Sequence, residues 1–246
     1  MNGSSVSRMA GICLLGLAMT MIVVAITFGA ATGESDMSRA EIEEFLADAE
    51  DNEGLFAIAI GAQTAGAMFI LAVASALHLL LSERNRFAAS FARAALLTAV
   101  AATIVNAGAN FTLATLANDL ADGGAGGAGR SEVLEIARAV GALDTFAWLA
   151  SIALTGIGVA AFGVVLLGRP SEAQALTPPR WLGWLALAGG ALSAAALLVL
   201  LDEAFFGLSS LGQLLVLVWS LLLGGWLVMK AGHEPQKQAA FEPAVG

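Results

Sequence analysis

The chain has 246 residues, of which 58% are hydrophobic and only 13% are charged, and its formal net charge is −9. A soluble domain carries about 25% charged residues, so this composition, with a mean hydropathy of +0.82, excludes an ordinary soluble protein. Apolar runs of about 20 residues predict membrane-spanning helices, not the short alternating segments of a β-barrel. The single cysteine, Cys13, excludes an intramolecular disulfide.

The first apolar run covers residues 9–32. At about 1.5 Å per residue it is long enough to cross a hydrocarbon core of ~30 Å. A cleaved signal peptide is the alternative, because Gly29-Ala30-Ala31 resembles a small-residue cleavage site. The run is longer than the hydrophobic region of a typical signal peptide, which favours a helix that is retained.

An acidic segment follows, with nine Asp or Glu and one Arg between residues 33 and 54. Ser38 and Glu41 match the S-x-x-E capping box of a helix start. Ile42, Phe45 and Leu46 then fall on one helical face. The pattern predicts a short amphipathic helix in the first external loop, either as a solvated loop helix or as a cap over an opening of the bundle.

Five more apolar runs follow along the chain. A Gly-rich segment, residues 123–129, predicts a flexible linker, and residues 131–142 predict a helix that continues into the next span. We therefore predict an all-α fold: a single transmembrane domain over residues 1–232, a bundle of six helices, and a cytoplasmic tail over residues 233–246. The predicted spans are about 9–32, 55–82, 87–116, 143–167, 181–201 and 206–229.

The distribution of charge sets the expected orientation. With six spans and a cytoplasmic N-terminus, eight Lys or Arg lie inside and three outside, as the positive-inside rule requires. Sixteen of the 20 acidic residues then lie outside, so the external face is strongly negative. We expect a multi-pass protein of the bacterial inner membrane, with both termini in the cytoplasm.

Five polar residues share the outer third of the predicted bilayer. A lipid-facing position would cost each of them free energy, so we expect them to point inward. They either hold helices together by hydrogen bonds or line a polar vestibule that opens outward, in which Asp144 is the only charge. The five candidates are Gln63, Asn106, Asn110, Asp144 and Gln213.

Three other groups of residues are notable. His78 and Arg93 flank a short turn near the inner face and form a candidate pair. Arg180, Trp181 and Trp184 begin the fifth span and predict an interfacial anchor that fixes its depth. Small residues predict close approach of helices; the glycines concerned are Gly61, Gly156, Gly189, Gly190, Gly224 and Gly225.

The sequence offers no catalytic motif, no metal-ligand set and no nucleotide-binding loop. Haem held between helices commonly needs two histidines, and besides His78 the chain has only His233, in the predicted tail. The few basic residues of the tail do not suggest nucleic-acid binding. The expected partners are the lipid bilayer and, beyond it, another membrane protein or a second copy of the chain.

Several short motifs along the chain carry a family resemblance. Two of them are LLGRP and TPPRWLGWLALAGG, with the matching residues Gly163, Gly168, Pro179, Arg180, Leu182, Gly183 and Gly189. The others are Ser7-Arg8-Met9-Ala10-Gly11, Phe91-Ala92-Arg93-Ala94 and residues 219–232. Together these motifs resemble a family of bacterial six-span membrane proteins catalogued only as a domain of unknown function. The long acidic first loop and the Gly-rich third loop depart from the pattern. The resemblance implies a fold and a topology but no activity.

Three classes of function fit the sequence. The first is a structural, accessory or sensory membrane protein without catalysis, which the missing motifs favour. The second is a small-solute or cation transporter or channel built on the outer polar residues. The third is a membrane-embedded enzyme acting on lipid or quinone, with His78 and Arg93 lining a cleft that opens to lipid.

The expected orientation has a direct test. A reporter fused after residue 246 should report a cytoplasmic location, and one inserted within residues 123–129 should report an external one. The reverse pattern would overturn either the number of spans or the retention of the first helix.

Overall fold

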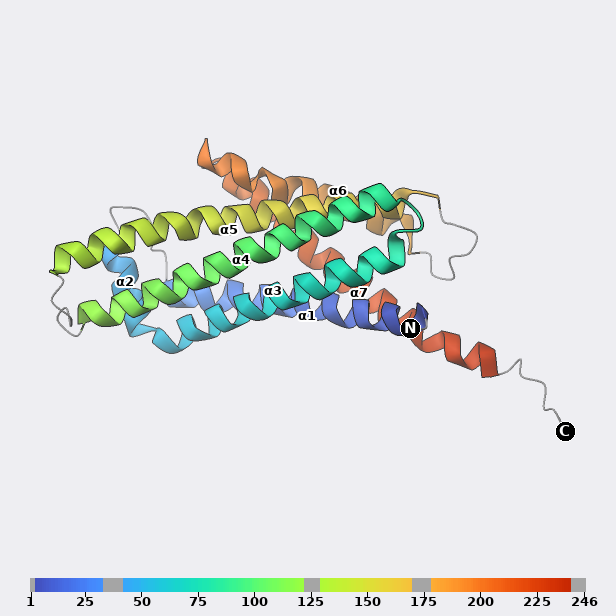
Figure 1. Cartoon of the computed structure of the whole chain (residues 1–246), viewed down its shortest axis with the longest axis horizontal. Helices are drawn as coiled ribbons and strands as arrows, with labels where there is room; N and C mark the ends of the chain where they lie inside the picture. The colour runs from blue at the N-terminus through green and yellow to red at the C-terminus, as the bar shows by residue number, and fades with distance from the viewer. Residues whose placement is uncertain (1–2, 33–41, 122–128, 170–177, 240–246) are drawn as a thin grey trace. The chain divides into compact units, whose positions relative to one another are not determined.

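The computed structural model describes residues 3–32, 42–121, 129–169 and 178–239. These residues are helical except at short turns and contain no strand (Figure 1). Six helices among them are long and apolar enough to cross a membrane. The all-α prediction is therefore confirmed, and the chain is a multi-pass membrane protein. The helices are α1 (Gly3–Thr32), α2 (Ile42–Asp51), α3 (Glu53–Leu81), α4 (Arg86–Ala121), α5 (Arg130–Leu167), α6 (Arg180–Ala194), the 3₁₀ helix η1 (Ala195–Leu200) and α7 (Phe205–Ala239).

The helix bounds differ from the predicted spans mainly at their ends. α5 begins at Arg130 and runs unbroken through the fourth span, as residues 131–142 predicted. The fifth span changes from α-helix to 3₁₀ helix after Ala194. α7 continues to Ala239, so the predicted tail begins as helix. The Gly-rich linker, residues 123–129, lies outside the described residues except at Gly129.

The chain folds into two compact units, each assembled from segments that are separated in the sequence. Unit 1 comprises Met1–Ala18, Phe69–Leu97 and Ala153–Gly246, and unit 2 comprises Met19–Met68 and Thr98–Ile152. The segments of unit 1 contain eight of the 11 basic residues, and those of unit 2 contain 14 of the 20 acidic residues. Unit 2 is thus strongly acidic, whereas unit 1 carries eight basic and six acidic residues. The prediction of a single domain remains a prediction.

Unit 1 is packed through close approaches between helix backbones at glycine. A Cβ on Gly156 of α5 would lie 2.6 Å from the carbonyl oxygen of Gly190 in α6. A Cβ on Gly11 of α1 would lie 2.7 Å from the carbonyl oxygen of Gly224 in α7. Only a residue without a side chain lets two helices approach this closely.

The predicted small-residue contacts are confirmed at some positions and wrong at others. Gly156, Gly189, Gly190 and Gly224 all lie against a neighbouring helix. A Cβ on Gly61 or Gly225 would have nothing within 4 Å, so neither glycine lies at a helix crossing. Composition alone does not separate the two groups, because the face that a glycine presents depends on which helices are neighbours.

Unit 2 is closed at one end by the short helix α2. Its apolar stripe, Ile42, Phe45 and Leu46, is 1%, 1% and 2% exposed, which confirms the predicted amphipathic helix. The predicted capping residues, Ser38 and Glu41, lie outside the described residues. The stripe packs into a cluster, here called the cap cluster, formed by Ala31, Ile42, Phe45, Leu46, Ala49, Phe56, Leu113, Ala117, Leu134 and Ala137.

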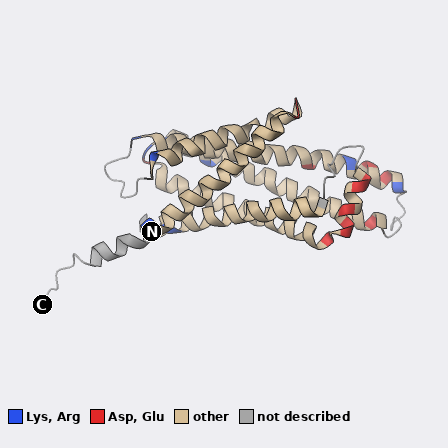
Figure 2. Cartoon of the chain, turned by 180° about the vertical axis from the view of Figure 1, so that it is seen from behind, with Lys and Arg blue, Asp and Glu red and all other residues tan. Residues whose placement is uncertain are grey.

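The cap cluster joins α2 to four other helices. The ring of Phe56 in α3 lies 5.9 Å from that of Phe45 and 5.7 Å from that of Phe28 in α1. At the junction of α2 and α3, Asn52 Nδ2 donates a hydrogen bond of 3.3 Å to the carbonyl oxygen of Ala31. The exposed face of α2 is acidic (Figure 2). α2 is thus a cap on this unit and not a solvated loop helix.

A matched pair of substitutions tests the close helix packing at glycine in unit 1. Gly190→Ala places a methyl group against the backbone of Gly156, and overpacking of this kind costs about 1–3 kcal/mol. Gly225→Ala meets open space and removes an unfavourable helix residue, so it should be neutral or slightly stabilising. Thermal unfolding in detergent should show a lowered Tm only for Gly190→Ala; equal behaviour of the two variants would contradict this packing.

Candidate functional site

Four of the five outer polar residues meet in the interior of unit 2. Gln63 comes from α3, Asn106 and Asn110 come from α4, and Asp144 comes from α5. Their exposed fractions are 9%, 3%, 1% and 1%. We call these four residues the polar cluster. Asn106 and Asn110 project from one side of α4 because they are four residues apart.

Two hydrogen-bonded pairs make up the polar cluster. Asn106 Nδ2 donates to Asp144 Oδ1 at 2.6 Å and lies 3.4 Å from the carbonyl oxygen of the same residue. Asn110 Nδ2 donates to Gln63 Oε1 at 3.4 Å. α4 is therefore tied to α5 at one level and to α3 one turn further along. Hydrogen bonds across membrane helices contribute about 0.6 kcal/mol on average.

One fully buried polar atom of the cluster has no partner. Asn110 Oδ1 is buried and accepts no hydrogen bond. A buried acceptor that has lost its water costs about 1–3 kcal/mol. Asp144 carries the only ionisable group of the cluster, and an ionised carboxylate is costly to bury unless it is paired. The cluster therefore combines one satisfied link, Asn106 to Asp144, with one open acceptor.

The residues that α3, α4 and α5 contribute to the cap cluster lie between the polar cluster and α2. Leu113 and Ala117 follow Asn110 by three and seven residues on the same face of α4. Phe56 precedes Gln63 by seven residues on α3, and Ala137 precedes Asp144 by seven on α5. On each of the three helices, an apolar residue of the cap cluster therefore lies one or two turns closer to α2 than the polar residue does. The polar cluster is sealed by an apolar layer on that side.

The fifth outer residue, Gln213, does not belong to this arrangement. It lies half-buried in α7, within unit 1. Its predicted depth matched that of the other four residues, but depth along a helix does not determine which helices are neighbours. The polar cluster therefore has four members.

The predicted inner pair is not formed in unit 1. Arg93 is exposed, and His78 Nδ1 is buried without a hydrogen-bond partner. An arginine of the turn between α3 and α4 is engaged instead. Arg84 Nη1 lies 3.4 Å from the carbonyl oxygen of Leu166, and partial burial lowers the pKa of Arg84. The short turn predicts that α3 and α4 are neighbours, but it does not predict the direction of each side chain.

The predicted anchor residues stand at the start of α6. Arg180 is exposed, and Trp181 and Trp184 are 53% and 63% exposed. Aromatic side chains that are apolar and carry one polar atom suit the interface between lipid and water. Their exposure is compatible with an anchor at the membrane surface, and this role remains a prediction.

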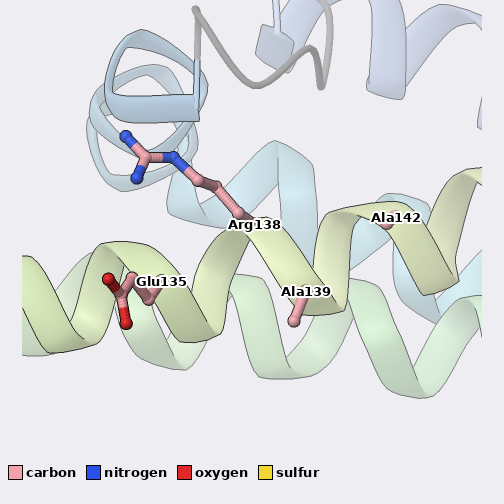
Figure 3. A pocket seen from close by; sticks show the side chains of 4 residues that line it. All are labelled: Glu135, Arg138, Ala139 and Ala142. Atoms are coloured by element: carbon pink, nitrogen blue, oxygen red, sulfur yellow. The ribbon is translucent and has the colours of Figure 1, made fainter.

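Two hollows in the described parts of the chain do not reach the polar cluster. One, of about 410 Å³, lies on unit 2 and is lined by Glu135, Arg138, Ala139 and Ala142. These residues follow a single face of α5 (Figure 3), so the hollow is a surface depression. The other, of about 390 Å³, is an apolar groove on unit 1. The notable site of unit 2 is therefore a closed cluster and not a cleft.

The described residues contain no group of three or more His, Cys, Asp or Glu that is suited to a metal ion. The polar cluster contains one carboxyl group and several amide oxygens. Oxygen atoms of both kinds can coordinate hard cations, and a carboxylate can also accept a proton. The sequence correctly predicts the burial of four of the five outer polar residues. It does not predict the cap cluster, although the stripe of Ile42, Phe45 and Leu46 is its visible signal.

Comparison with known proteins yields one finding. No curated protein and no solved structure matches the chain. A family model described as "Domain of unknown function (DUF4386)" matches residues 9–231, which takes in the polar cluster and most of each of the six apolar helices. The chain, a six-helix membrane protein, therefore belongs to the DUF4386 family.

Proposed function

We propose that the protein acts without catalysis, as a structural, accessory or sensory component of the membrane. The observation that carries this proposal is the closure of the polar cluster. Asn106, Asn110 and Asp144 are at most 3% exposed, and the cap cluster covers them on the side of α2. A catalytic or transport site must admit its substrate, whereas these groups are used to hold three helices together.

The energetics of membrane helices support this role. Apolar helices gain little from leaving lipid, so polar links and close packing determine which helices associate. The bond from Asn106 to Asp144 and the bond from Asn110 to Gln63 specify that α4 lies between α5 and α3 in unit 2. The acidic face of α2 then remains available to solvent, cations or a basic partner.

One observation favours a second candidate, cation translocation. Asn110 Oδ1 is an open oxygen ligand in the same cluster as the carboxyl group of Asp144. Movement of α2 would bring this oxygen and the carboxylate within reach of the solution. In that case the cap cluster would act as a gate and the acidic face of α2 would concentrate cations.

A structural role predicts a specific pattern of stability. Asp144→Leu leaves Asn106 Nδ2 without its acceptor and should cost about 1–3 kcal/mol. Asp144→Asn keeps an acceptor oxygen and removes the charge, so it should unfold close to the wild-type Tm. The double variant Asn106→Leu/Asp144→Leu should recover much of the loss, because neither partner is then left unpaired. Thermal unfolding of the purified proteins measures all three.

The same variants separate the two candidate functions. Proteoliposomes containing the wild-type protein should pass Na⁺, K⁺ and H⁺ no faster than protein-free vesicles. If the wild-type protein conducts and Asp144→Asn abolishes that flux without lowering Tm, the non-catalytic proposal is wrong and translocation replaces it. Phe45→Ala, which weakens the cap cluster, should then increase the flux.

A further inference from the structure

Unit 1 carries an apolar groove that the proposed function does not use. It has a volume of about 390 Å³ and is formed by the first turns of α4, the last turns of α5 and the second half of α6. Its lining combines phenylalanine and aliphatic side chains with glycine and alanine residues, which are here called the floor. The lining includes Phe87, Phe91, Val164, Leu187, Gly190 and Ala191.

The floor of the groove exists because two helices meet at glycine. Gly156 and Gly190 bring the backbones of α5 and α6 together, and Gly158 of α5 lies against Leu96 of α4. The three helices lie side by side in this unit (Figure 1). Phe87 and Phe91 stand beside the floor with 82% and 51% of their surface exposed. The small residues and the two large rings together leave a groove that is open to lipid.

Basic residues stand at one end of the groove. Leu187, Gly190, Ala191 and Ala194 lie on one face of α6, and Arg180 precedes Leu187 by seven residues on that face. Seven residues of helix span about 10 Å. On α4, the exposed Arg86 directly precedes Phe87.

We propose that this groove binds one acyl chain of an anionic glycerophospholipid whose phosphate lies beside Arg180 and Arg86. The hydrocarbon chain lies between Phe87, Leu187 and Ala191. The basic residues recognise the headgroup, since guanidinium groups match phosphate in charge and hydrogen-bonding geometry. The site is distinct from the polar cluster, which belongs to unit 2.

The dimensions favour a lipid chain over a helix. The lining of α5 runs from Ile157 to Val164, which is seven residues or about 10 Å. A helix with its side chains is ~10–12 Å wide and needs a longer stripe to pack against. A single hydrocarbon chain is narrower and fits a short channel. Arginines at the end of a groove also match a phosphate, whereas an apolar helix would leave them unused.

The groove is not the cleft that the enzyme alternative requires. A cleft open to lipid was expected to be lined by His78 and Arg93, and neither residue lines this groove. The groove holds no ionisable or nucleophilic side chain among its lining residues. It is therefore a binding site and not a reaction site.

The test measures the phospholipid that remains bound to the purified protein, by native mass spectrometry, after exposure to phosphatidylglycerol or phosphatidylcholine. The wild-type protein should retain one phosphatidylglycerol per chain in preference to phosphatidylcholine. Ala191→Phe fills the groove from an exposed position and should abolish retention of either lipid. Arg180→Gln should lower the preference about fivefold, the equivalent of ~1 kcal/mol for one basic residue.

Matched controls separate binding from unfolding. Ala101→Phe is an equal change at an exposed position of α4 outside the groove, and Arg138→Gln removes an exposed arginine of unit 2. Both should retain lipid as the wild-type protein does, and all four variants should keep the wild-type Tm. Gly190 is left unchanged because a Cβ there would strike α5.

Three outcomes would overturn the assignment. Retention by Ala191→Phe at the wild-type level shows that the groove is not the site. An unchanged preference in Arg180→Gln shows that the headgroup is not recognised there. If Ala191→Phe instead converts a dimer to a monomer in light scattering, the groove is an interface between copies of the chain.

Discussion

The hydrogen bond from Asn106 to Asp144 is the interaction on which the architecture of unit 2 most depends. In the hydrocarbon core no water is present to form a hydrogen bond with a polar group, so its partner must come from the protein. Asn106 Nδ2 and Asp144 Oδ1 lie 2.6 Å apart on two different helices. Neither group can move to a lipid-facing position without losing that partner. The bond therefore fixes the rotation of α4 and α5 about their own axes.

Threonine side chains of α4 escape this constraint, unlike the amides and the carboxyl group that make up the cluster. Thr112 donates to the carbonyl oxygen of Gly108 at 2.9 Å, and Thr115 donates to that of Phe111 at 3.0 Å. Each bond lies within one helix, so neither threonine needs a partner from a neighbouring helix. An Asn or Gln side chain has two donors and an acceptor, and its own helix cannot satisfy them all. Such residues gather where helices meet.

The same reasoning sets how much of the fold can be predicted from sequence. The spans and the amphipathic α2 follow from apolar runs and a 3.6-residue period, both of which are local properties. The burial of Asn106, Asn110, Gln63 and Asp144 follows from the cost of polar groups in lipid. Which of them would be partners does not follow, because the order of helices in space is a long-range property. Gln213 has the same predicted depth and lies in the other unit.

The two units use opposite means to hold helices together. In unit 1 the helices meet backbone against backbone, through Gly156 and Gly190 or Gly11 and Gly224, and the gain is dispersion over a close approach. In unit 2 they are joined by polar side chains sealed by Phe45 and its neighbours. Backbone crossings leave shallow grooves on the lipid side, as beside Gly190, whereas a sealed polar cluster fills the interior. A lipid site in unit 1 and a closed cluster in unit 2 are thus consequences of how each unit is packed.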